Sequence, residues 1–241
     1  MLEMFPLFFD PTWILLLPAL IFAMYAQAKV QSTFARYLRV PARAGYTGAQ
    51  VARQILDRAN LHDVRVEMTH RHLGDHYDPR QRVVRLSPEV YNGRSIASVG
   101  VAAHETGHAL QHARAYVPLS IRNSLFPVAA FGSSAAFPLF FIGLLFGSMG
   151  SWDLGYSMMT IGIWFFIAAL AFQIITLPVE FDASARAMRL LTTGGYLAAD
   201  EAPKTKAVLT AAALTYVAAT AMAVAQLLRL LVLRGMFSQR D

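Results

Sequence analysis

Four long runs of apolar residues alternate with polar stretches along the chain. They extend over residues 12–28, 124–147, 156–178 and 207–233. As α-helices, the runs are long enough, or nearly so, to cross about 30 Å of hydrocarbon. The last run is rich in Ala and carries Gln226 and Arg229. It therefore either crosses the membrane or packs as a long helix against the others, with its arginine reaching to the interface.

The polar segment of residues 29–122 has shorter periodicities. Residues 48–60 carry apolar side chains at helical spacing, which predicts a short amphipathic helix. Alternation over 64–68 and the β-branched stretch 83–86 predict two short strands, with turn residues at 78–81 between them. We therefore expect a mainly α membrane protein with about four transmembrane helices and a small α+β domain.

This pattern also predicts how the chain divides into parts. The first apolar run follows Glu3 and Asp10 without any Lys or Arg, so it is interpreted as a retained anchor and not as a secretory signal. The expected parts are an N-terminal transmembrane anchor (1–28), the polar domain (29–122), a transmembrane hairpin (123–178), a helix and connection (179–206), and a C-terminal transmembrane or membrane-packed helix (207–241).

The amino-acid composition agrees with a membrane protein and limits the side chains that could bind a metal. Hydrophobic residues make up 56% of the chain against 15% charged residues, which exceeds the ordinary balance of a globular protein and agrees with membrane spans. Cysteine is absent, which excludes disulfides, thiolate nucleophiles, iron–sulfur clusters and zinc sites built on sulfur. Any metal must therefore be held by His and carboxylate side chains.

The distribution of basic residues predicts the orientation in the membrane. Fourteen of the 21 Lys and Arg residues lie in residues 29–122, whereas residues 1–28 and the turn at 147–156 contain none. Basic loops are retained on the cytoplasmic side, so we expect the polar domain to face the cytoplasm. The net charge of +6 is explained by these loops, and a nucleic-acid partner is not expected.

Residues 95–113 form a predicted helix that carries a histidine pair. His104 and His108 are four residues apart, so both imidazoles leave one face of the helix and can bind one Zn²⁺. Glu105 follows the first histidine and can take a proton from a water molecule without being a ligand itself. This HExxH arrangement predicts zinc-dependent hydrolysis of peptide bonds.

A catalytic zinc has three protein ligands and one open position, so a third ligand must come from elsewhere. Glu180 directly follows the third apolar run. Since the second and third runs form a hairpin, Glu180 returns to the membrane face that carries His108. His112 is excluded because eight helical residues separate it from His104 by about 12 Å. Asp182 is a second-choice ligand or a partner of the ligands.

A second polar cluster, LGDHYDP at residues 73–79, precedes the second predicted strand. It is interpreted either as a turn closed by Asx-type hydrogen bonds or as the position of an oxyanion-stabilising group, His76 or Tyr77. The strand at residues 82–87 could offer its edge to an extended substrate.

Four segments carry a family resemblance that covers most of the chain from Gly45 onward. They are DHYDP (75–79), LSPEVY (86–91), GVAAHETGHALQ (100–111) and PVEFDASARA (178–187). With these segments the chain resembles the bacterial neutral zinc metallopeptidases of the YugP type, which are small membrane proteins. It is also distantly similar to the membrane gluzincins, the HtpX-type and CAAX-prenyl proteases.

The resemblance implies a zincin-like domain in a bacterial cytoplasmic (inner) membrane. It implies one zinc per chain held by His104, His108 and Glu180, with Glu105 as the general base and polypeptide cleavage at the cytoplasmic surface. Gluzincins commonly have an acidic residue four positions after the ligand Glu, and here that position is Ser184. Either Asp182 replaces the acidic residue or the surroundings of the ligands differ.

We therefore expect a membrane endopeptidase that acts on membrane-associated polypeptides. One alternative is a membrane scaffold in which a closed zinc site, with a fourth ligand such as His76 or Asp182, only stabilises the fold. A second alternative is a transporter that uses the cluster as an intramembrane ion site, which would place His104 inside a span.

Overall fold

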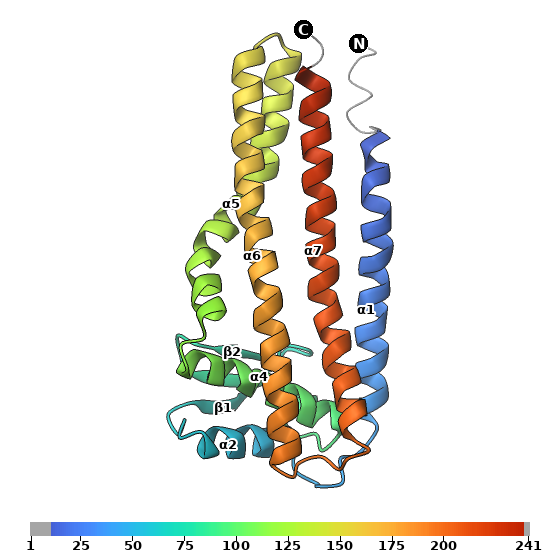
Figure 1. The fold of residues 1–241 in the computed structure, drawn as a ribbon, viewed down its shortest axis with the longest axis vertical. Helices are drawn as coiled ribbons and strands as arrows, with labels where there is room; N and C mark the ends of the chain where they lie inside the picture. The colour runs from blue at the N-terminus through green and yellow to red at the C-terminus, as the bar shows by residue number, and fades with distance from the viewer. Residues whose placement is uncertain (1–10, 239–241) are drawn as a thin grey trace. The chain divides into compact units, whose positions relative to one another are not determined.

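A computed structural model describes residues 11–238 of the chain. The first ten residues of the expected anchor and the last three of the C-terminal part lie outside the described residues. The elements are the 3₁₀ helix Pro11–Leu16, α1 (Leu17–Leu38), α2 (Gly48–Arg58), β1 (Arg65–Met68), β2 (His76–Asp78), β3 (Val83–Leu86), α3 (Pro88–Tyr91), α4 (Ile96–Ala113), α5 (Val117–Ser148), α6 (Trp152–Thr193) and α7 (Ala202–Ser238) (Figure 1). The predicted mainly helical class with a small α+β part is confirmed.

Four helices within residues 11–238 are long and apolar enough to cross a membrane. They are Pro11–Leu38, Val117–Ser148, Trp152–Thr193 and Ala202–Met236. The third of these is longer than the predicted run because α6 continues through Pro178 to Thr193. Proline removes one backbone donor, and a long packed helix tolerates that loss. Glu180 therefore lies on the same helix as the third span.

The described residues divide into two compact units. The first contains residues 11–25, 121–175 and 216–238. Its buried core is formed by Ala136, Phe140, Leu144, Met159, Ile163, Phe166 and Leu230. Within it α5 and α6 form the predicted hairpin (Figure 1). Glycines allow the close approach of these two helices, since a Cβ on Gly143 would meet the Gly155 carbonyl oxygen at 2.6 Å.

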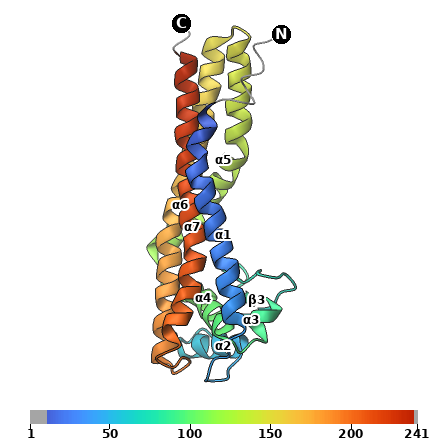
Figure 2. The same ribbon diagram turned by 90° about the vertical axis from the view of Figure 1, so that its right-hand side faces the viewer.

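Arg229 of α7 is buried in the first unit. Its side chain does not extend to the surface: its guanidinium lies 4.0 Å from the centre of the Trp13 ring, and its Nε donates a hydrogen bond to Thr12. These contacts offset the cost of removing a charge from water. They also join the start of the first apolar helix to α7, beside which α1 runs (Figure 2).

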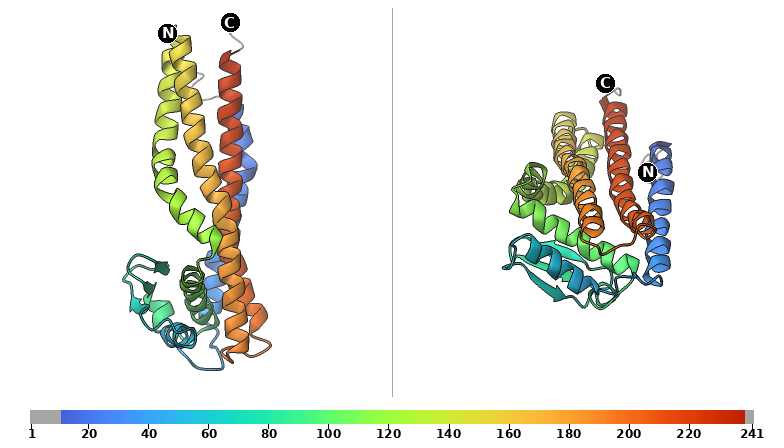
Figure 3. Two further views of the ribbon diagram at one scale, coloured as in Figure 1. Left: turned by 60° about the vertical axis from the view of Figure 1, so that its left-hand side comes forward. Right: turned by 60° about the horizontal axis from the view of Figure 1, so that its bottom comes forward.

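The second unit contains residues Ala26–Ser120 and Thr176–Thr215. Its three-stranded sheet has the order β1-β3-β2, with β3 parallel to β1 and antiparallel to β2. The strands and α2 lie beside α4 (Figure 3). The idea that the strand at residues 82–87 offers its edge to a substrate is therefore wrong, because β3 is hydrogen-bonded on both sides.

Local sequence explains the boundaries of α2 and β2. Thr47 is the N-cap of α2 and forms a capping box with Gln50. The Thr47 hydroxyl accepts a hydrogen bond from the Gln50 backbone N–H, and the Gln50 side-chain oxygen accepts one from the Thr47 backbone N–H. The turn interpretation of residues 73–79 is wrong for His76–Asp78, which form β2. Asp78 closes the turn that follows by accepting from the backbones of Arg80 and Gln81.

Helix α4 is the central element of the second unit. Ser95 caps it by accepting from the Ser98 backbone, and most of its residues are buried. Gly107 faces α6 so closely that a Cβ there would lie 2.7 Å from the backbone oxygen of Ala183. Only glycine allows this approach, which places Glu180 and Ser184 of α6 against the histidines of α4.

Candidate metal centre

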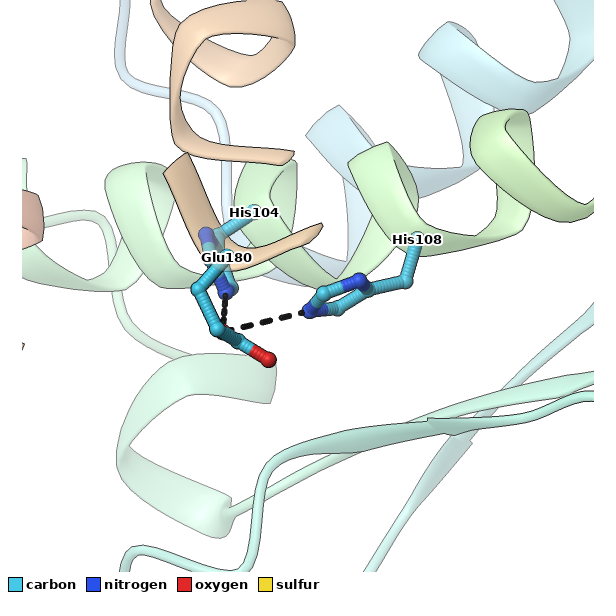
Figure 4. A group of neighbouring side chains, drawn as sticks. All are labelled: His104, His108 and Glu180. Atoms are coloured by element: carbon cyan, nitrogen blue, oxygen red, sulfur yellow. Dashed lines mark ion pairs between the residues drawn. The ribbon is translucent and has the colours of Figure 1, made fainter. Parts of the chain in front are cut away.

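Helices α4 and α6 bring His104, His108 and Glu180 into one group (Figure 4). Their ligand atoms all lie within 4.8 Å of one another. The Oε2 atom of Glu180 is 3.3 Å from Nε2 of His104 and 3.6 Å from Nε2 of His108. The side chains are well covered: the exposed fraction is 15% for His104, 12% for His108 and 4% for Glu180.

The donor set fits a zinc ion. Three ligands placed at about 2.1 Å from a tetrahedral centre are about 3.4 Å apart, which is close to the two distances observed. Glu180 Oε2 is buried and makes no hydrogen bond, although it faces two imidazole nitrogens. A buried carboxylate oxygen without a hydrogen bond is costly unless a cation compensates it, and here that cation is either a protonated imidazole of the two ion pairs drawn in Figure 4 or a bound metal ion. Among residues 11–238, no fourth ligating side chain joins this group.

Glu105 lies between the two histidines in sequence and is 8% exposed. Burial raises the pKa of its carboxyl group, while the imidazoles of His104 and His108 act to lower it. It is not one of the three grouped ligands. Glu105 is therefore a buried carboxyl beside the candidate metal centre, and such groups are candidates for proton transfer.

Other polar side chains support the two histidines through their Nδ1 atoms. Ser184 Oγ lies 3.1 Å from Nδ1 of His104, and Gln111 Oε1 lies 3.0 Å from Nδ1 of His108. Gln111 also donates to Asp182, which accepts a further hydrogen bond from Arg186. Ser184, at the position where gluzincins commonly have an acidic residue, thus contacts one histidine, and Asp182 reaches the other through Gln111.

The remaining predicted residues lie around β2 and the end of α4. Tyr77 is half-buried on the core side of the sheet, and its hydroxyl lies 2.9 Å from Nδ1 of His112. His76 projects from the other face of the strand and bonds through Nδ1 to the Gly74 carbonyl. The structure therefore brings Tyr77 against α4, whereas it does not bring His76 to the three grouped ligands. His112 is also outside that group.

Sequence reasoning missed Gln111. This side chain is fully buried and connects α4 to α6. It is three residues after His108, so both side chains lie on the same side of the helix. A polar residue at that spacing, in an otherwise apolar helical stretch, was a signal that could have identified it.

Comparison with known families and proteins agrees with this geometry. Residues 12–235 match the family described as "Putative neutral zinc metallopeptidase". The chain belongs to this family. Membership confirms the resemblance, and the matched range includes every residue of the candidate metal centre.

One relative of the chain is a Bacillus subtilis (strain 168) protein named "Putative membrane protease YugP". It is 48% identical to this chain over 215 residues, which cover 89% of this chain and 92% of the relative. No solved structure matches the chain. Both names agree with the four candidate spans and with a His-His-Glu group that is consistent with a zinc site.

Proposed function

We propose that this protein is a zinc-dependent endopeptidase of the membrane, with one zinc per chain held by His104, His108 and Glu180. The observation that carries the proposal is the buried Oε2 of Glu180, which faces both Nε2 atoms and has no hydrogen-bond partner. Since the group has only three ligating side chains among residues 11–238, a tetrahedral ion held there would keep a fourth, exchangeable position, which hydrolysis requires. Family membership supports the same reaction class.

Each residue of the centre has a definite task in this proposal. When bound, zinc supplies Lewis-acid polarisation of the scissile carbonyl and lowers the pKa of a water molecule. Glu105 accepts a proton from that water molecule and passes it to the leaving amine. The pKa of Glu105, raised by burial, suits a group that must both accept and donate a proton. Tyr77, on the α4 side of the sheet, is in the better position of the two predicted groups to stabilise an oxyanion.

The alternatives receive less support from the same residues. A structural zinc site is normally closed by four protein ligands, and His76 lies on the far face of the strand. Asp182 is engaged by Gln111 and Arg186. A transporter would need His104 inside a span, whereas α4 is not among the four candidate spans of residues 11–238.

The proposal includes a location and a substrate class. The basic residues of 29–122 favour a polar domain on the cytoplasmic side of a bacterial inner membrane, where membrane-associated polypeptides would be cut. The proposed parts are those expected above: the anchor 1–28, the domain 29–122, the hairpin 123–178, the segment 179–206 and the C-terminal helix 207–241.

Orientation can be tested directly because the chain has no cysteine. We expect Ser151→Cys, in the exposed turn between α5 and α6, to react in intact cells with a maleimide that does not cross membranes. Arg71→Cys, in the loop between β1 and β2, should react only after the cells are opened. The opposite labelling pattern would contradict the cytoplasmic location.

The decisive experiment for the reaction is Glu105→Gln, which removes the base but no ligand. Purified protein in lipid nanodiscs is offered a diverse peptide library, and cleavage is read by mass spectrometry beside zinc content. We expect unchanged zinc and a rate of cleavage lower by about 10²- to 10⁴-fold. Glu67→Gln, a carboxylate on β1 that pairs with Arg65, serves as the matched control.

Three outcomes would overturn the proposal. The first is a Glu105→Gln variant that cleaves as fast as the parent. The second is a parent that retains no zinc after purification in zinc-replete buffer. The third is a zinc-loaded parent that cleaves no member of the library, which would favour the scaffold.

A further inference from the structure

Gln111 makes three hydrogen-bonding contacts that together determine its orientation. Its Nε2 atom donates to the Val179 carbonyl oxygen at 2.8 Å and to Asp182 Oδ2 at 2.8 Å. Its Oε1 atom lies 3.0 Å from Nδ1 of His108. The side chain is fully buried, so water does not substitute for these partners.

The hydrogen-bond partners of the Gln111 side-chain amide allow only one orientation of its oxygen and nitrogen atoms. A primary amide nitrogen has two hydrogens, and here they meet a backbone carbonyl and a carboxylate, neither of which can donate. Turning the amide over would place its oxygen against two other oxygens in a buried position, at the cost of two hydrogen bonds. The oxygen of Gln111 must therefore face His108.

The orientation of Gln111 determines the tautomer of His108. Since Oε1 is only an acceptor, Nδ1 of His108 must carry the hydrogen. In the neutral ring, the lone pair is then on Nε2, the atom that lies 3.6 Å from Glu180 Oε2 in the candidate metal centre. Nε2 is thus the nitrogen that remains to ligate a bound zinc ion.

We infer that Gln111 is a positioning residue, which fixes the tautomer and ring orientation of His108, and that Asp182 acts through it. This inference rests on the proposed function, because it assigns His108 as a zinc ligand through Nε2. Asp182 is itself held by Arg186, whose guanidinium lies over the Tyr116 ring at 5.5 Å. The contacts therefore lead from the Arg186–Asp182 ion pair on α6, through Gln111, to His108 on α4.

His104 provides an internal comparison. Its Nδ1 atom meets the hydroxyl of Ser184, which can rotate and can either donate or accept. This contact holds the ring but does not determine its tautomer. The two histidines therefore differ, and loss of Gln111 should affect His108 more than loss of the Ser184 hydroxyl affects His104.

The test uses full-length protein in detergent with ¹⁵N-labelled histidine. Long-range ¹H–¹⁵N spectra of the metal-free protein, recorded at a pH high enough to keep the rings neutral, report the tautomer of each of the seven histidines, and His108→Ala identifies the His108 signals. Zinc affinity is measured separately by competition with a chelator. The variants are Gln111→Leu and Asp182→Ala, and the matched control is Thr106→Val. Thr106 is also fully buried on α4, but its hydroxyl bonds only to its own helix at the Ala102 carbonyl.

For the parent, we expect His108 in the Nδ1–H form. Gln111→Leu should give a mixture of tautomers and a zinc affinity lower by about 10- to 100-fold, the range typical for partners of ligating histidines. Asp182→Ala removes one of two acceptors from Gln111 and should give a smaller change in both readouts. Thr106→Val should change neither.

The inference fails if the parent His108 is in the Nε2–H form, or if Gln111→Leu retains both the tautomer and the affinity. It also fails if Thr106→Val lowers zinc affinity as much as Gln111→Leu, because the effect would then come from general packing. If Gln111→Leu does not fold, an unchanged Asp182→Ala variant refutes the relay. A parent that binds no zinc would refute the proposed function, while the spectra of metal-free protein would still decide the tautomer.

Discussion

The close contact between Gly107 and α6 leads to a prediction about metal affinity. A Cβ at Gly107 would lie 2.7 Å from the Ala183 carbonyl oxygen, whereas ordinary contacts begin at 3.4 Å. Because the obstacle is backbone, Gly107→Ala must separate the two helices by about 0.7 Å. Gly107 is adjacent to His108, and Ala183 is three residues after Glu180. The separation therefore falls within one turn of the candidate ligands.

The magnitudes distinguish an effect on the site from an effect on the fold. Overpacking costs about 1–3 kcal/mol, while replacing Gly by Ala in a helix stabilises it by about 1 kcal/mol. The net change in the free energy of unfolding should therefore be about 0–2 kcal/mol. Metal sites tolerate displacements of only about 0.2 Å. Moving Glu180 by several times that distance should lower zinc affinity by about 10- to 100-fold, equivalent to about 1.4–2.8 kcal/mol.

The assay is chelator competition for zinc, run beside thermal unfolding in the same detergent. Gly235→Ala is the matched control, since Gly235 is also in a helix but its Cβ would meet no atom within 4 Å. We expect Gly235→Ala to keep the parent affinity. A Gly107→Ala variant within about twofold of the parent affinity would refute the reasoning, because a twofold change is only about 0.4 kcal/mol.

Three further predictions concern the centre and its supporting unit. Glu180→Ala should reduce zinc from about one per chain to a small fraction, measured by elemental analysis, because two ligands remain; an unchanged content would remove Glu180 from the site. Thr47→Ala should destabilise the protein by about 1 kcal/mol through loss of the capping box with Gln50, measured by denaturant unfolding, and Thr47→Ser should restore it. Burial raises the pKa of Asp75, which accepts hydrogen bonds from Ser87, so its proton binds more tightly in the folded state. The parent should therefore lose stability as pH rises from the unfolded pKa of about 3.9 through the raised folded pKa, whereas Asp75→Asn should not show this loss. A difference in melting temperature between the two proteins that stays constant from about pH 3.5 to 7 would contradict this prediction.

Much of this protein is determined by local features of its sequence. Four long apolar runs predict the four candidate spans, because crossing hydrocarbon requires length and apolarity more than any particular fold. The spacing of His104 and His108 places both imidazoles on one side of α4, since the geometry of a helix repeats over short distances. The proposal of Glu180 as third ligand needed only one further step, the return of a hairpin to its starting face.

Only the tertiary structure decided which side chains surround these candidate ligands. Gln111 meets Asp182 across 71 positions, and Ser184 meets His104 across 80. Such pairs depend on how closely two helices pack, and here that distance depends on the missing side chain of Gly107. The central position of β3 in its sheet and the burial of Arg229 are also results of tertiary packing. Periodicity reports which side of an element is apolar, whereas the partner of that side is chosen by packing of the whole unit.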